Sequence, residues 1–296
     1  MTQPVKQWAV TNADKSQTVI TYQWDPPPPA DPPPPPPPML VGSAAAPNNI
    51  LSGHPTYPGQ QIGLAFHSPT KGLVPTEIAV AKKVGCLPVS CYKDDPTPAL
   101  LKTYLDAVYA AGIEAWLNLD QEVNANHYRT ASVYKSLVAQ QLDIVAAHPA
   151  GKAGLVTCVE KFSYFQGVSA MEDYWTGLCD GVLFDRYAPA GYTPPDVLFA
   201  ECEQFAAKAG AAAKLAGRPF FWGVGEHGVT QQTATDPSGQ GQADALATNV
   251  GHIQAAGGRC VLVWDGPGTE GRVYTCSTPA RAGWRGLTLA ARAAAS

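Results

Sequence analysis

The feature that most constrains this chain is a regular alternation of short apolar runs with helix-like segments from residue 39 onward. Apolar runs of about four to eight residues, rich in β-branched and aromatic side chains, are typical of buried strands. Eight such runs occur, at residues 40–43, 62–66, 86–92, 115–120, 154–159, 181–185, 220–224 and 260–264. We therefore predict a buried sheet of eight strands.

Helix-like segments separate most of these runs, whereas the first gap, 44–61, is typical of a loop. The predicted helices cover residues 76–84, 98–111, 131–147, 196–216 and 244–256. Strands that alternate with helices indicate a parallel sheet, and eight such units over about 240 residues match the size of a (β/α)8 TIM barrel, an α/β fold. An open doubly wound sheet is the alternative, but no GxGxxG motif follows the first run.

The segment that precedes the barrel has two parts. Residues 1–24 include a strand-like run at 18–22 but cannot bury a core by themselves. Residues 25–38 are almost entirely proline and predict an extended polyproline II rod, which rises about 3.1 Å per residue. We predict an N-terminal arm at 1–24, a polyproline linker at 25–38 and the barrel at 39–296. The rod either holds the barrel away from an assembly or surface that the arm grips, or is a disordered leader or docking ligand.

Composition excludes several classes of partner. The formal net charge is −4 at pH 7 and no basic stripe is present, which argues against binding to nucleic acid. No apolar stretch approaches the roughly 18 residues of a membrane-spanning helix, and the N-terminus lacks the pattern of a signal peptide. The seven cysteines form no CxxC pair, so we expect most of them to be small buried apolar residues.

Polar residues follow most of the apolar runs, where the carboxyl ends of barrel strands place catalytic groups. Because side chains alternate along a strand, Asn118, Asp120 and Glu122 are expected to share one direction. Asp185 and Tyr187 are expected to do the same after the sixth run. Several acids at one rim predict a carboxylate-lined pocket.

The order of short motifs along the chain resembles that of the retaining (β/α)8 glycoside hydrolases of clan A, most closely the mannanase-type branch, family 26. The motifs are Val89-Ser90-Cys91-Tyr92-Lys93, Gln121-Glu122-Val123-Asn124, Asp185-Arg186-Tyr187 and Gly225-Glu226-His227-Gly228. The likeness spans about residues 40–266. The family usually has His immediately before its acid/base Glu, and this chain has Gln121 at that position.

The resemblance implies a role for each motif residue. Glu122 is the expected acid/base and Glu226 the expected nucleophile, with Tyr187 hydrogen-bonded to Glu226. The residues expected to bind or position the sugar are Asp185, Tyr187, Trp264, Asn118, Gln121, Lys93 and His67, with Asn124 as a weaker candidate. His227 is expected to face away from the site. If Glu122 is not the acid, Asp120 or Glu160 is the next to test.

We therefore predict a retaining glycoside hydrolase that cleaves a polysaccharide, such as a cell-wall or capsule glycan, through Glu122 and Glu226. No HExxH, GxSxG or phosphate-binding loop is present, so no metal and no cofactor are expected. A chain with an N-terminal arm and rod, no signal peptide and a polysaccharide-directed barrel resembles tail-associated proteins of phages that infect actinobacteria, which would make a virion or another surface assembly the partner of the arm. The alternatives are a non-catalytic carbohydrate-binding barrel and a structural virion or adhesion protein.

Overall fold

The computed structural model describes residues 5–11, 17–23, 39–44, 59–67, 75–92, 96–122, 124, 129–163, 167–189, 192–266 and 273–295. The chain divides into two compact units, Met1–Pro36 and Pro37–Ser296. In the first unit, β1 (Val5–Thr11) pairs antiparallel with β2 (Gln17–Gln23) to form a two-stranded sheet. Sequence analysis predicted the second of these strands but not the first.

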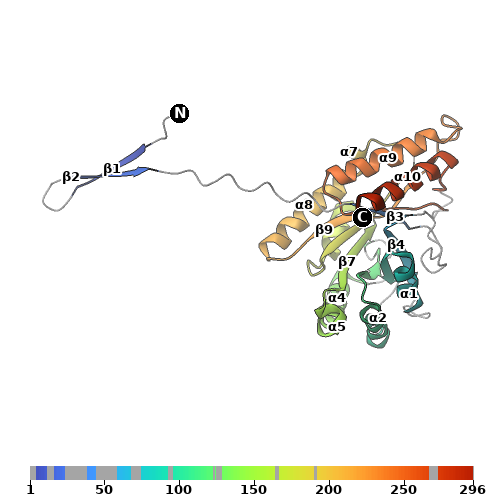
Figure 1. The fold of residues 1–296 in the computed structure, drawn as a ribbon, viewed down its shortest axis with the longest axis horizontal. Helices are drawn as coiled ribbons and strands as arrows, with labels where there is room; N and C mark the ends of the chain where they lie inside the picture. The colour runs from blue at the N-terminus through green and yellow to red at the C-terminus, as the bar shows by residue number, and fades with distance from the viewer. Residues whose placement is uncertain are drawn as a thin grey trace. The chain divides into compact units, whose positions relative to one another are not determined.

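The second unit contains eight parallel strands that close into a barrel in the order β10-β3-β4-β5-β6-β7-β8-β9 (Figure 1). The strands are β3 (Leu40–Ser43), β4 (Ile62–His67), β5 (Leu87–Tyr92), β6 (Ala115–Gln121), β7 (Val156–Ser163), β8 (Gly181–Ala188), β9 (Phe221–Val229) and β10 (Cys260–Val263). All eight predicted strands are confirmed, and with them the (β/α)8 fold. Because the strands are parallel, their carboxyl ends meet at one mouth of the barrel.

Helices surround the barrel (Figure 1). They are α1 (Pro75–Val84), α2 (Pro98–Ala111), α4 (Ala131–Ala147), α5 (Pro149–Lys152), α6 (Gly167–Tyr174), α7 (Pro195–Leu198), α8 (Ala200–Leu215), α9 (Gln240–Ala255) and α10 (Thr278–Ala295). Local signals explain several ends. The Thr97 hydroxyl accepts the Leu100 N–H at the start of α2, and Gly112 ends that helix in the left-handed region at φ 62°.

Alternation along the strands separates two apolar cores. The inner cluster fills the barrel and includes Ile62, Leu64, Val89, Cys91, Trp116, Val159, Leu183, Cys260 and Leu262. The larger outer core lies between the strands and the helices. On β8, for example, Leu183 belongs to the inner cluster, while Phe184 packs edge-on against Phe205 of α8 with ring centroids 5.9 Å apart. All seven cysteines are buried, as predicted for most of them, and all seven are free thiols.

One predicted helix is broken in the structure. Residues 196–216 were expected to form a single helix, but α7 ends at Leu198 and α8 begins at Ala200. Phe199, at the break, is fully buried, and its ring lies 5.5 Å from that of His227. The Leu198 carbonyl accepts a hydrogen bond from Arg186 Nε at 2.6 Å. Tertiary contacts therefore set this boundary.

The last helix, α10, was not predicted, although it packs against α9 and β3. Trp284 is 1% exposed and donates its indole N–H to the Gly42 carbonyl at 3.0 Å. Near the end of the helix, the Arg292 guanidinium donates to the carbonyls of Gln60 at 2.8 Å and Gly85 at 2.7 Å. The C-terminal helix is therefore part of the barrel unit.

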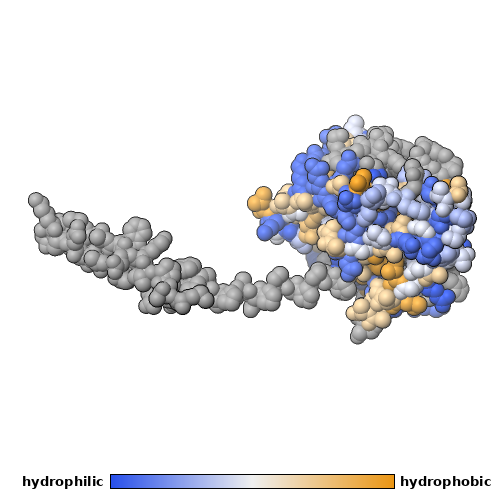
Figure 2. All heavy atoms as spheres, turned by 90° about the horizontal axis from the view of Figure 1, so that it is seen from above, coloured by the Kyte–Doolittle hydropathy of each residue, from blue (hydrophilic) through white to orange (hydrophobic). Residues whose placement is uncertain are grey.

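The face of the barrel unit that Figure 2 shows carries hydrophilic residues over much of its described area, with apolar residues gathered in a few groups. Leu215, at the end of α8, is the most exposed of the large apolar residues that the structure describes, at 91%. Among the described helices, none is both long and apolar enough to cross a membrane.

Candidate active site

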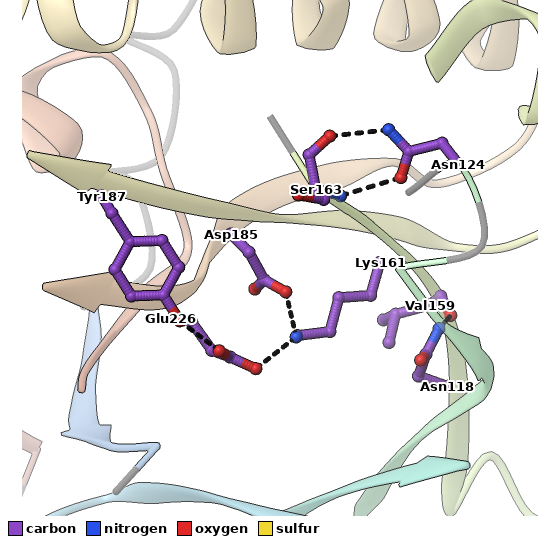
Figure 3. Close-up of polar contacts among 8 residues, drawn as sticks. All are labelled: Asn118, Asn124, Val159, Lys161, Ser163, Asp185, Tyr187 and Glu226. Atoms are coloured by element: carbon purple, nitrogen blue, oxygen red, sulfur yellow. Dashed lines mark hydrogen bonds and ion pairs between the residues drawn. The ribbon is translucent and has the colours of Figure 1, made fainter. Parts of the chain in front are cut away.

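A buried lysine occupies the centre of the site (Figure 3). Lys161 lies two residues after Val159 on β7, and Val159 belongs to the inner cluster. The Lys161 ammonium donates to Oδ2 of Asp185 on β8 and, at 2.6 Å, to Oε1 of Glu226 on β9. Lys161 and Asp185 are fully buried, and Glu226 is 4% exposed. Three consecutive strands thus bring one cation and two carboxyl groups together.

Tyr187 holds the other side of the Glu226 carboxyl. Its hydroxyl donates to Glu226 Oε2, so each carboxyl oxygen of Glu226 has a donor (Figure 3). The Tyr187 ring packs on that of Tyr274, with centroids 4.6 Å apart. Gly228 makes room for both rings, because a Cβ there would lie 2.8 Å from Tyr274 and 2.9 Å from Tyr187. The predicted contact between Tyr187 and Glu226 is present.

A β-bulge turns Glu226 into the barrel. Val224 pairs with Phe184 and packs in the outer core, whereas Glu226 pairs with Asp185, so β9 has one extra residue between these pairs. An extra residue interrupts the alternation of side chains. Glu226 therefore reaches the inner face, which regular alternation from Val224 would not allow. The extra residue, Gly225, has no side chain to collide with Lys161.

Glu122 directly follows β6 and is half-buried. Its backbone φ is 50°, in the left-handed region that residues other than glycine seldom occupy, and such strained residues cluster at functional sites. Its N–H donates to the Lys161 carbonyl at 3.1 Å, which ties the turn to β7. The register of β6 against β7 shifts between Asn118 and Gln121, so the alternation that predicted a shared direction for Asn118, Asp120 and Glu122 is interrupted.

Burial and charge compete in this cluster. Burial raises the pKa of Glu226, and the Glu122 charge adds to that rise, while the Lys161 ammonium and the Tyr187 hydroxyl oppose it. Burial likewise raises the pKa of Asp185. For Lys161, burial alone would lower the pKa, but the nearby carboxylates outweigh it and hold the pKa above its ordinary value. The lysine is therefore charged at neutral pH.

Two predicted amides contact the backbone of β7 (Figure 3). Asn118 donates to the Val159 carbonyl at 3.0 Å. Asn124 donates to the Ser163 carbonyl at 2.6 Å and accepts the Ser163 N–H at 2.9 Å. Both amides are fully buried, so what the structure describes for them is contact between neighbouring strand ends. Sugar binding by these amides stays a prediction.

The other expected substrate-binding residues are described to different extents. Trp264, which follows β10, is half-buried and packs against the inner cluster, and its backbone N–H donates to the His227 carbonyl at 2.8 Å. Lys93 lies outside the described residues. So do the side chains of His67 and Gln121, whose backbones belong to β4 and β6. Their roles stay predictions.

The hypothesis that Glu160 replaces Glu122 as the acid is wrong, because the Glu160 side chain does not face the site. It alternates with Lys161 and lies on the outer face of β7, where its Oε1 accepts from Tyr134 of α4 at 3.3 Å and from the Thr176 N–H at 2.9 Å. Asp120, the other fallback, forms an ion pair with Arg129 at 2.6 Å. His227 faces away from the site as predicted.

His227 is fully buried, with its Nδ1 2.7 Å from the Arg186 carbonyl and its Nε2 2.9 Å from Asn249 of α9. Burial lowers the pKa of His227 to about 4, so the ring is neutral at pH 7. These contacts give it a structural role on the outer side of β9.

Sequence reasoning missed Lys161 and Tyr274. A lysine that keeps the alternation of a buried strand, two residues after Val159, was the available signal for the first. For Tyr274 no local signal existed, because its partner Tyr187 comes from a distant strand. Among the residues that the structure describes, no three His, Cys, Asp or Glu side chains group so that they could hold a metal ion.

No protein-family model and no curated protein sequence matches the chain. Solved structures match it. The catalytic domain of a family 26 endo-β-1,4-mannanase from Bacillus sp. JAMB-750 superposes with a TM-score of 0.57 and 11% identity, over 84% of this chain and 85% of that one. A family 39 glycoside hydrolase from the gut symbiont Bacteroides cellulosilyticus WH2 superposes with a TM-score of 0.61 and 13% identity, over 96% of this chain and 70% of that one.

A β-mannanase from a symbiotic protist of the termite Reticulitermes speratus superposes with a TM-score of 0.51 and 13% identity, over 84% of this chain and 86% of that one. At such identities the similarity establishes the fold. The predicted resemblance to the (β/α)8 glycoside hydrolases, family 26 among them, is thus confirmed as a shared architecture.

Proposed function

We propose that the chain is a retaining glycoside hydrolase with Glu226 as nucleophile and Glu122 as acid/base. The observation that carries the proposal is the Glu226 carboxyl, which is buried at the carboxyl end of the barrel and has a donor on each oxygen. A nucleophilic carboxylate must be ionised and oriented before the sugar arrives. The fold supports the proposal, because several solved structures that share it are glycoside hydrolases.

The chemistry needs two carboxyls in different protonation states. A Glu226 oxygen attacks the anomeric carbon while Glu122 gives its proton to the glycosidic oxygen, and the bond to the leaving sugar breaks. Water then attacks the glycosyl-enzyme, Glu122 takes its proton, and the Glu226 carboxylate leaves with the configuration retained.

Two properties of Glu122 support its part in this pair. It is half-buried in a strained turn after β6, and its charge acts on Glu226 and Asp185. A retaining mechanism requires the two carboxyls to be about 5 to 5.5 Å apart. This spacing stays a prediction for Glu122 and Glu226.

The proposed substrate is a polysaccharide. Several of the solved structures that share the fold are described as endo-β-1,4-mannanases or β-mannanases, so β-1,4-mannan is the first glycan to test. Cell-wall and capsule glycans follow. The assay should detect new reducing ends, because cleavage within a polymer produces them at each event.

Glu122→Ala and Glu226→Ala should differ in kind. With Glu122 removed, an aryl glycoside with a good leaving group needs little protonation, so its first step should survive better than that of the polysaccharide, and azide should restore turnover. With Glu226 removed, no covalent intermediate forms, and activity on both substrates should fall by several orders of magnitude, roughly 10⁴-fold or more. Steady-state rates with and without azide measure both effects.

Asp143→Ala, at an exposed position of α4, is the matched control and should keep parental rates. Parental activity of Glu122→Ala on the polysaccharide would remove Glu122 from the acid/base role. Sugar binding by the parent without hydrolysis, unaffected in either glutamate variant, would instead support a non-catalytic carbohydrate-binding barrel.

A further inference from the structure

The Glu226 carboxyl lies among several other ionisable groups. They include Lys161 on β7, Asp185 and Tyr187 on β8, Glu122 after β6, and, deeper in the barrel, Cys91 on β5. If the carboxyls of Glu226, Asp185 and Glu122 were all ionised, the Lys161 ammonium would face three negative charges. Burial further raises the free-energy cost of keeping these carboxyls ionised, because a charge is unfavourable in surroundings of low polarity.

Lys161 is built into this position. Its chain crosses the inner face of the barrel from β7 to β9, and the backbone leaves room for it at Gly225. A Cβ at that glycine would lie 3.1 Å from Lys161 Cε and 3.2 Å from Asp185 Oδ1. Two carboxylates from adjacent strands then fix the ammonium. A flexible surface lysine has no comparable constraint.

From these contacts we infer that Lys161 is the positioning residue that keeps Glu226 ionised and aimed into the barrel mouth, and that Asp185 is the group that anchors the Lys161 ammonium. The role is specific for catalysis only if Glu226 is the nucleophile, so this inference rests on the proposed function. It deepens that function by assigning Lys161, which contacts no substrate in this scheme, and by giving Asp185 an indirect part.

The two residues should have different effects on Glu226 when they are neutralised. Lys161→Met removes the cation and leaves a side chain of similar length. The pKa of Glu226 should then rise by about 1 to 3 units, the size of the effect that a neighbouring opposite charge has on a carboxyl. Asp185→Asn removes a negative charge but keeps an oxygen that can accept from the ammonium, so the pKa of Glu226 should stay at or below its value in the parent.

Carbon-13 NMR of the full chain, labelled at glutamate carboxyls, measures this titration without an activity assay. Glu226→Gln identifies the signal. Lys208→Met is the matched control, because Lys208 forms a surface ion pair with Glu172 at 2.6 Å and is 62% exposed, and it should leave the Glu226 titration unchanged. In the pH profile of kcat/KM, the acidic limb should move to higher pH in Lys161→Met, because the nucleophile must be deprotonated to react. In Asp185→Asn the acidic limb should not move to higher pH.

An unchanged pKa of Glu226 in Lys161→Met would overturn the inference, and so would a raised pKa of Glu226 in Asp185→Asn. If Lys161→Met fails to fold, Asp185→Asn decides alone, with an upward shift against the inference and no upward shift for it. The proposed function fails separately. If the parent protein shows the expected titrations but no glycosidase activity, Lys161 still keeps Glu226 ionised, but the protein is not a hydrolase.

Discussion

Glu160 and Glu226 are both buried glutamates, but different partners surround their carboxyls. Glu226 contacts an ammonium, whereas Glu160 receives hydrogen bonds from the neutral Tyr134 hydroxyl and the Thr176 N–H. Burial raises the pKa of Glu160 from its ordinary value of 4.5 to about 7, and the hydrogen bonds offset only part of that rise. Glu160 and Lys161, which are consecutive residues of β7, thus place their side chains on opposite faces of the barrel wall.

The raised pKa of Glu160 predicts a stability that depends on pH. The folded state keeps a proton that the unfolded state releases above pH 4.5, so stability falls as the pH rises from about 4.5 to about 7. The full loss above that range is roughly 3 kcal/mol. Glu160→Gln removes the ionisation, and its melting temperature should exceed that of the parent by several degrees at pH 8, with the difference vanishing toward pH 4.5.

Thermal melts across this pH range make the comparison. Asp143→Asn, exposed on α4, is the control for loss of one surface charge and should not reproduce the pattern. A constant difference between Glu160→Gln and the parent at every pH would contradict the assignment of the effect to ionisation.

At the scale of elements, β9 is the strand on which the site depends. Its bulge turns Glu226 inward, and Gly225 leaves space for the Lys161 chain. His227, the next residue, is fixed on the outer side by Asn249 of α9. The strand therefore presents two adjacent polar residues to opposite faces, one to the site and one to the helix layer.

Gly225→Ala should destabilise the barrel and reduce activity. The added methyl group would lie 3.1 Å from Lys161 Cε and 3.2 Å from Leu183 Cβ, so the packed neighbours must move. Overpacking of this kind costs about 1 to 3 kcal/mol. Gly251→Ala, in open space on α9, is the matched control and should stabilise by about 0.5 to 1 kcal/mol. Urea unfolding measures both, and equal midpoints would contradict the steric argument.

At the scale of the whole molecule, the chain consists of the unit Met1–Pro36 and the unit Pro37–Ser296. A two-stranded sheet such as β1–β2 is marginally stable on its own. An assembly that grips the arm, a virion for example, stays a prediction. The barrel unit has its own closed sheet and two apolar cores, so it contains what a folding unit needs.

Deletion of residues 1–38 should leave the melting temperature of the barrel unchanged, because the predicted proline rod would contribute little to a core. A lower melting temperature would show that the arm or rod packs on the barrel.

Truncation after Ser277 is the informative contrast. It removes α10, and with it Trp284 and Arg292, so a large fall in stability is expected although fewer residues are lost.

Much of the fold could be predicted from local patterns. A buried strand has to be apolar over its own length, so the eight runs that build the barrel stand out in the sequence. Asp185 and Tyr187 share the inner face as alternation along β8 requires. The polyproline stretch follows from composition alone. Helix α10 could also have been found, since Ser277 caps its start and Pro279 lies in its first turn.

What the tertiary structure decided depends on how distant segments meet. The bulge that turns Glu226 inward and the shift beside Glu122 are offsets between neighbouring strands, and no single strand encodes them. Lys161 became a site residue only when β8 and β9 brought two carboxyls to it. Periodicity belongs to each segment and can be read locally. The direction and charge of the Glu226 carboxyl belong to the closed barrel, because strand register and burial exist only after the strands pair.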